Sequence, residues 1–123
     1  MTDGFENWRL LCQLAVGDMQ GYGDFPAVYA MRDSTTQEIL KFGSTGELRR
    51  RIFANYLCGI GGSTKESTTQ RIHKELFAEN MISRVQLAWL ETKDKAEAER
   101  KETEFRNNHK EVYGRRPIWD RQG

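Results

Sequence analysis

Alternation of apolar and polar side chains predicts three short β-strands in this chain. The segments 27–31 (AVYAM) and 39–45 (ILKFGST) are rich in apolar and β-branched residues, and residues 32–37 between them are polar. Two such runs joined by a short turn-forming segment are typical of an antiparallel hairpin. A third strand is predicted over 82–91, where apolar and polar residues alternate most clearly.

The period of two residues also predicts which hairpin side chains share a face. In the first strand, Tyr29 shares a face with the residues two positions away on either side. In the second strand, Leu40 and Phe42 are expected on one face, and Ile39 and Lys41 on the other. Lys41 is therefore a charged residue on a strand that otherwise looks buried.

A helix is predicted directly after the second strand. The sequence 44–47 (STGE) matches a capping box, in which the first side chain accepts a hydrogen bond from the fourth residue's backbone. Leu48, Ile52 and Tyr56 then recur at helical spacing and mark the buried side.

Three further helices are predicted from the same signals. A second capping box at 67–70 precedes a short amphipathic run, and Asp94 with Glu97 begins a helix that extends to about Glu111. Apolar residues near helical spacing predict an N-terminal helix over 4–18.

These elements predict an α+β fold, a three-stranded antiparallel sheet flanked by helices with an additional N-terminal helix. Residues 1–24 form this helix and a glycine-containing link, and residues 25–123 form the core domain. The N-terminal helix packs against the core from outside, or it is a contact surface for a partner or a second copy.

Composition is that of one small globular domain. The chain has 123 residues, of which 37% are hydrophobic and 30% charged. No segment has the length and hydrophobicity of a membrane span, and the first residues do not resemble a secretory signal, so we expect a cytoplasmic protein without membrane contact.

Charge gives a local rather than a global indication of function. The formal net charge is only +1, but basic residues far outnumber acidic ones between Lys41 and Lys74. Such a segment can attract phosphate groups, or it can be an ordinary solvated face. The candidate nucleic-acid contacts within or near it are Arg49, Arg50, Asn55, Tyr56, Arg71, His73 and Lys74.

Two common kinds of site are not indicated. Cys12 and Cys58 are far apart and the histidines are scattered, so we expect reduced thiols and no structural zinc. The glycine-containing loop 58–64 lacks the Gly-Lys-Ser/Thr ending of a phosphate-binding P-loop, so no nucleotide cofactor is expected.

The hairpin and the helix after it bring several polar groups together. Arg51 and Asn55 are four residues apart and lie on one side of the predicted helix. Because this helix follows the second strand at once, we expect Tyr29, Lys41 and Arg51 to lie close together.

Glu102 is a charged residue on the predicted inward side of the last helix. Ala98, Phe105 and Val112 mark a thin apolar stripe on the last helix, and Glu102 falls within about 40° of its centre. An inward glutamate is costly unless it is paired or binds a metal. The residues alone leave two readings open, a structural salt bridge, for example to Arg51, and a metal ligand.

Together these features resemble the GIY-YIG nuclease family. The resemblance rests on AVY at 27–29, KFG at 41–43, Arg51 eight residues later, Glu102 followed by Phe105, and the closing segment 116–120. It implies a metal-dependent DNA endonuclease that hydrolyses phosphodiester bonds.

In that family reading, each site residue has a role. Glu102 holds one Mg²⁺ or Mn²⁺ ion, Arg51 binds the scissile phosphate, and Tyr29 orients or deprotonates the attacking water. Lys41 stands where the family has a tyrosine, and Asn55 where relatives often have histidine or tyrosine. Asp120 stands where the family has an asparagine, and could help to hold the metal.

Two other functions stay open. The substitutions at Lys41 and Asp120 are compatible with a degenerate domain that binds nucleic acid without cutting it, and the N-terminal helix is compatible with a protein-interaction module. One active site nicks one strand, so double-strand cleavage would imply a homodimer or two binding events.

Overall fold

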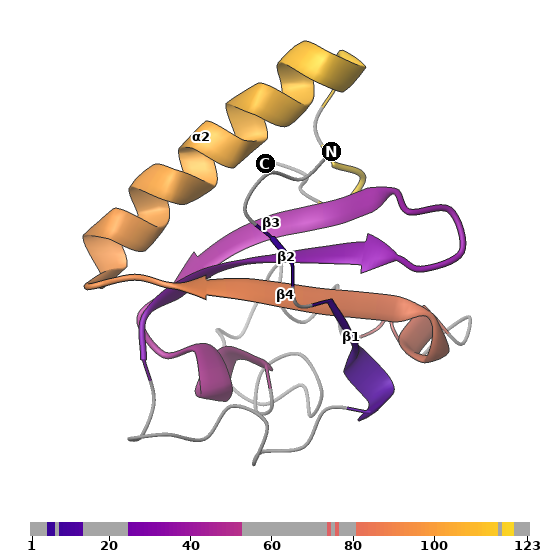
Figure 1. Ribbon diagram of the computed structural model, residues 1–123, viewed down its shortest axis with the longest axis horizontal. Helices are drawn as coiled ribbons and strands as arrows, with labels where there is room; N and C mark the ends of the chain where they lie inside the picture. The colour runs from indigo at the N-terminus through magenta and orange to yellow at the C-terminus, as the bar shows by residue number, and fades with distance from the viewer. Residues whose placement is uncertain are drawn as a thin grey trace.

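The seven residues of β2 (Ala27–Asp33) form the central strand of an antiparallel sheet. The computed structural model describes residues 5–6, 8–13, 25–52, 74, 76, 81–115 and 117–119. Within them the strand order is β1-β4-β2-β3, with β1 at Arg9–Leu10, β3 at Ile39–Thr45 and β4 at Val85–Glu91 (Figure 1).

The central place of β2 follows from its composition. Residues 27–31 are apolar on both faces of the strand and are completely buried. A strand of this kind is stable only where both of its edges are paired and both faces are covered. Pairing with β3 on one side and β4 on the other meets that requirement.

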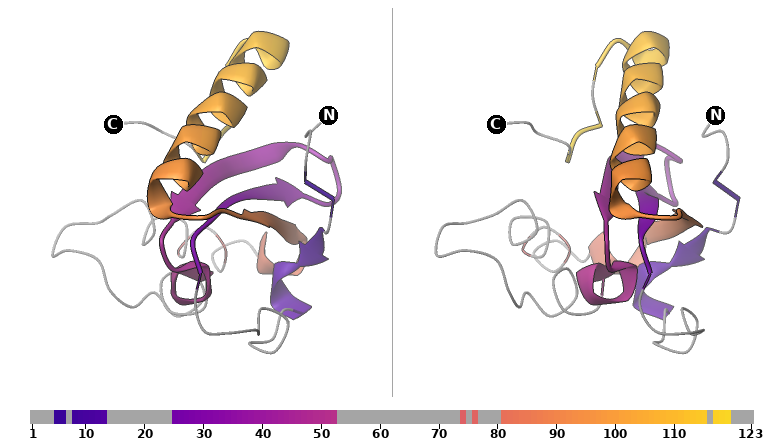
Figure 2. Two further views of the ribbon diagram at one scale, coloured as in Figure 1. Left: turned by 60° about the vertical axis from the view of Figure 1, so that its left-hand side comes forward. Right: turned by 90° about the vertical axis from the view of Figure 1, so that its left-hand side faces the viewer.

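Helix α2 (Lys95–Tyr113) covers one face of the sheet. Phe105 of α2 stacks on Phe42 of β3 with ring centroids 5.6 Å apart, and Val28 and Ala30 of β2 belong to the same cluster. The opposite face is covered by the helical residues 48–52, so that these and α2 lie on opposite sides of the sheet (Figure 2).

The ends of α2 follow the signals in the sequence. Asp94 caps the first turn, its side chain accepting a hydrogen bond of 2.8 Å from the Glu97 backbone N–H. The Glu97 carboxylate in turn accepts a bond of 2.7 Å from the backbone N–H of Lys93, the residue before the cap, in an arrangement close to a capping box. The last turn ends at Gly114, whose φ of 79° is a left-handed conformation that glycine adopts without strain.

The hairpin contains one irregularity that the alternating pattern did not predict. Met31 pairs with Lys41 and Arg32 with Ile39, so Leu40 is an extra residue in β3. As a result Ile39 packs with Phe42, and Leu40 packs in the cluster on the opposite face, the reverse of the predicted arrangement. The backbone carbonyl of Leu40 accepts a hydrogen bond of 2.8 Å from Trp119 N–H.

The predicted N-terminal helix is wrong for the part of it that the structure describes. Arg9 and Leu10 form β1 on the edge of β4, and Leu11–Gln13 form the 3-10 turn η1. Phe5 packs on the α2 face and Leu11 on the opposite face, because the chain crosses the sheet edge between them. Apolar residues that pack on the two faces of a sheet, on either side of its edge strand, can have the same spacing in sequence as the apolar side of a helix.

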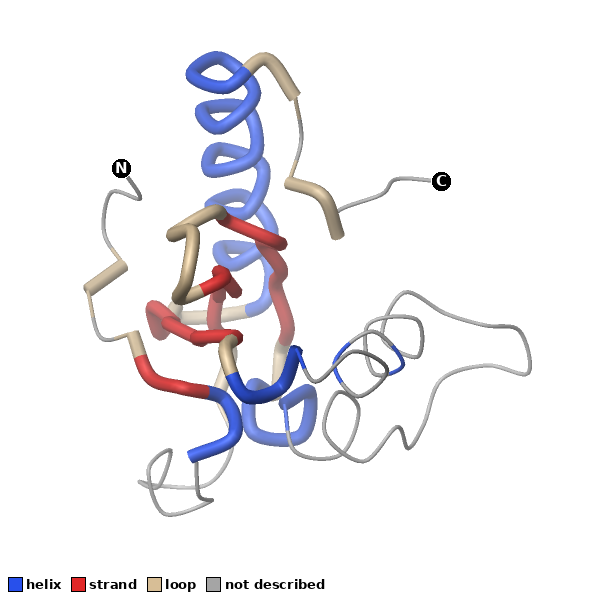
Figure 3. The backbone as a smooth tube through the Cα atoms, turned by 90° about the vertical axis from the view of Figure 1, so that its right-hand side faces the viewer, coloured by secondary structure: helices blue, strands red, loops and turns tan. Residues whose placement is uncertain are grey.

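Over the described residues the sheet therefore has four strands, where three were predicted. The three predicted strands are present, the last beginning at Val85 because Met81–Ser83 form a short 3-10 turn, η4. Figure 3 shows β1 along one edge of the sheet and residues 117–119 along the other. No helix within the described ranges has both the length and the apolarity needed to cross a membrane.

Candidate functional site

The Tyr29 side chain lies directly over Gly43. These two residues are paired across β2 and β3, so their side-chain positions share a face of the sheet. A Cβ atom added at Gly43 would lie 2.8 Å from Tyr29 Cε1 and closer still to Cζ and the hydroxyl oxygen. Tyr29 is completely buried. The missing side chain at residue 43 is therefore what lets the tyrosine ring extend across β3.

Lys41 lies on the same face as Tyr29. It pairs with Met31, two residues beyond Tyr29 on β2, and it is only 6% exposed. The structure thus brings these two predicted site residues onto adjacent strands of one face. An ammonium group with so little exposure is costly to bury without compensating interactions.

The helical turn that follows the end of β3, residues 48–52, contains Arg49, Arg50 and Arg51. Leu48 and Ile52 of this turn are buried in the same cluster as Tyr29. The Arg51 N–H donates a helical bond of 3.0 Å to the Glu47 carbonyl, and the Nε atoms of Arg49 and Arg51 are buried.

The cap of this turn differs from the prediction. The Glu47 N–H donates a bond of 3.0 Å to the side-chain oxygen of Thr45, and not to that of Ser44. Strand β3 continues through Thr45, so the first cap position is shifted by one residue. This shift turns the Ser44 hydroxyl away from the turn and toward α2.

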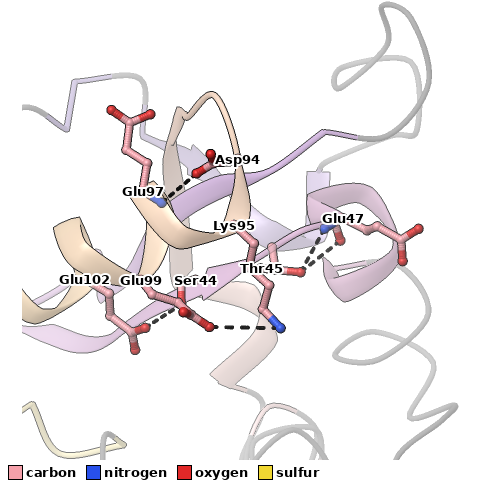
Figure 4. A network of polar contacts seen from close by, with 8 residues as sticks. All are labelled: Ser44, Thr45, Glu47, Asp94, Lys95, Glu97, Glu99 and Glu102. Carbon is pink, nitrogen blue, oxygen red and sulfur yellow. Dashed lines mark hydrogen bonds and ion pairs between the residues drawn. The ribbon is translucent and has the colours of Figure 1, made fainter.

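Glu102 extends from α2 to this same end of β3. The Ser44 hydroxyl donates a hydrogen bond of 2.5 Å to Glu102 Oε1 (Figure 4), and Arg106 Nη2 donates one of 2.5 Å to Oε2. The Glu102 side chain is 14% exposed, which agrees with the inward position predicted from the helical spacing. Its ion-pair partner is Arg106, four residues along the same helix, and not Arg51.

Three of the four predicted catalytic residues therefore lie against the two faces of β3. Tyr29 and Lys41 occupy one face, and Glu102 contacts Ser44 on the other, because successive strand residues point in opposite directions. Among the described strands β3 is the outermost on its side of the sheet, so Gly43 and Ser44 lie at this edge. Groups on opposite faces of an edge strand can both contact a ligand that lies along that edge.

Several predicted residues lie outside the described ranges, namely Asn55, Tyr56, Arg71, His73 and Asp120. Lys74 is described and exposed. Trp119 is buried in the cluster that contains Tyr29, so this residue of the predicted closing segment lies on the Tyr29 face.

Glu102 has the donor chemistry for a divalent cation. Mg²⁺ is commonly held by one or two carboxylates together with water and substrate phosphates. A carboxylate has about four lone-pair positions, and Glu102 uses one on each oxygen. Among the described residues no group of three or more His, Cys, Asp or Glu side chains could hold a metal ion.

Ser44 and Arg106 were not predicted as members of the site. The spacing of four residues between Glu102 and Arg106 is a signal that the sequence contains. Ser44 was predicted to cap the following helix, because its position three residues before Glu47 fits a capping box. Comparison of the chain with protein-family profiles, characterised proteins and solved structures gives no match.

Proposed function

We propose that this chain is a metal-dependent DNA endonuclease of the GIY-YIG type, with its reaction centre at the Gly43–Ser44 end of β3. The observation that supports it most is that three predicted site residues meet within residues 41–44 of one outer strand. Lys41 belongs to this strand, Tyr29 of β2 lies over Gly43, and Glu102 of α2 accepts a hydrogen bond from Ser44. The arginine-bearing turn that follows supplies positive charge beside the same edge.

Phosphodiester hydrolysis needs an activated water molecule and stabilisation of negative charge on the phosphate. The Arg51 guanidinium offers a planar pair of donors suited to a phosphate. Tyr29 and Lys41 are the groups that orient the water or accept its proton, and for the tyrosine this requires a pKa below the ordinary value of about 10. A Mg²⁺ or Mn²⁺ ion on Glu102 would neutralise charge on the phosphate and the leaving oxygen.

One observation favours a second function, nucleic-acid binding without cleavage. Tyr29 is completely buried and Lys41 is nearly so, and both Glu102 oxygens already accept hydrogen bonds. A hydroxyl that is enclosed by its own fold does not reach a phosphate unless neighbouring groups move. The interaction-module reading is weakened, since the N-terminal helix on which it rested is not formed over the described residues.

Cleavage of supercoiled plasmid and of branched oligonucleotides, in Mg²⁺ and in Mn²⁺, tests the proposal. The critical variant is Glu102→Gln, which keeps an acceptor for Ser44 but removes the charge. The matched control is Glu104→Gln, an exposed residue on the same helix. We expect cleavage by the wild type and by the control, and none with EDTA or with Glu102→Gln.

Two outcomes would contradict the proposal. Wild-type protein that binds DNA in a salt-dependent manner but cuts none of the substrates would establish the binding function instead. Cleavage that survives in Glu102→Gln would exclude this carboxylate as the metal ligand. If the wild type binds DNA without cutting it, Lys41→Ala would show whether the buried lysine contributes to DNA binding.

A further inference from the structure

Arg106 binds one oxygen of the Glu102 carboxylate, the group that the proposed function assigns as the ligand of a cation. Its Nη2 atom donates to Glu102 Oε2 at 2.5 Å, and Ser44 holds the other oxygen. The two side chains are 34% and 14% exposed, so this ion pair is better shielded from solvent than a typical surface pair. Shielding from solvent strengthens the attraction between the two charges. An added cation therefore competes with a stronger ion pair for the Glu102 carboxylate.

Two other ion pairs in the described structure are much more open, whereas the pair of Arg84 with Asp33 is partly shielded but involves other residues of the sheet. Lys95 and Glu99 lie 4.0 Å apart on the same helix with side chains 65% and 59% exposed, and the pair of Arg50 with Glu47 is similarly exposed. Surface pairs of that kind contribute little. The pair of Arg106 with Glu102 is distinct because it is short, shielded and located at the end of β3 where the site residues gather.

We infer that Arg106 is the counter-ion of Glu102 in the metal-free protein and competes with the divalent cation for this carboxylate. The inference rests on the proposed function, because it requires Glu102 to be the cation's ligand. The guanidinium compensates the charge of a glutamate that faces the sheet, which would otherwise be costly. A cation that binds Oε2 must displace this donor or share the oxygen with it, so Arg106 lowers the cation affinity and sets the concentration at which the site fills.

Mn²⁺ affinity, measured by electron paramagnetic resonance without DNA, tests this competition. Arg106→Gln is compared with Arg100→Gln, which removes the same charge from an exposed position on the same helix. We expect Arg106→Gln to bind Mn²⁺ about three- to tenfold more tightly than the wild type, as loss of a shielded ion pair implies, and Arg100→Gln to be nearly unchanged. Equal affinities in the two variants would overturn the inference.

A measurement on the wild-type chain keeps the test independent of variant folding. In an NMR titration with Mg²⁺, the Arg106 Nε–Hε signal should shift in step with the Glu102 side-chain carboxyl signal, while that of Arg100 stays in place. A Glu102 signal that shifts without Arg106 would overturn the competition and leave the proposed function standing. Mn²⁺ binding by Glu102→Gln with wild-type affinity would instead refute the metal assignment itself.

Discussion

Replacing Gly43 with alanine is the most direct test of how the Tyr29 ring is held. The added Cβ would overlap the end of the Tyr29 ring, and this tyrosine is completely buried. The ring cannot swing into solvent without leaving its cluster of Leu48, Ile52 and Trp119. Either the ring or the backbone of β3 must therefore move.

The magnitude follows from two opposing effects. Overpacking a well-filled core costs about 1–3 kcal/mol. Alanine has less conformational freedom than glycine in the unfolded chain, which stabilises the folded protein by about 0.4–1 kcal/mol. We therefore expect Gly43→Ala to lower the free energy of unfolding by about 1–2 kcal/mol, or the melting temperature by roughly 3–12 °C for a domain of this size.

Thermal unfolding followed by circular dichroism measures this change, with Gly46→Ala as the control. At Gly46 an added Cβ would meet only Lys95 side-chain carbons at 3.7 and 3.8 Å, an ordinary contact, so we expect little change. Gly43→Ala should also cost much less in a Tyr29→Ala background, since the overlap is then gone. Equal melting temperatures for Gly43→Ala and Gly46→Ala would refute the reasoning.

Three further substitutions test other contacts. Ser44→Ala removes the donor to Glu102 and should lower the free energy of unfolding by about 1–2 kcal/mol in urea denaturation, whereas no change would mean that this hydrogen bond contributes nothing. Asp94→Ala removes the cap of α2 and should cost about 1 kcal/mol, with Asp94→Asn nearly neutral in the same denaturation experiment. Gln37→Gly should be neutral or stabilising by up to about 1 kcal/mol, since Gln37 has a φ of 66°, and a clear loss in melting temperature would show that its side chain matters more than its backbone.

The sequence predicted those features that depend on neighbours along the chain. The hairpin, the third strand and the cap at Asp94 each follow from a short local pattern, and all are present. The inward position of Glu102 followed from helical geometry alone and agrees with its low exposure. Its partners could not be predicted as readily, because Ser44 comes from a different element.

The features that were predicted wrongly depend on contacts distant in sequence. Leu40 is an extra residue in β3, and an alternating pattern cannot reveal such an irregularity. Residues 9–10 pair with β4 although their neighbours have helix-like spacing, because an open sheet edge satisfies their backbone groups. The edge position of β3, on which the proposed site depends, follows from the strand order and not from the sequence of β3.

The placement of β4 between β1 and β2 has a consequence for synthesis on the ribosome. Arg9 pairs with Leu87, and Val28 with Leu90, so both earlier strands must wait for a partner that is translated late. Until then the apolar strand β2 has one unpaired edge, a state that favours association between nascent chains. The sheet can close only when residues 85–91 have left the exit tunnel, so we expect this domain to fold only after β4 has been synthesised.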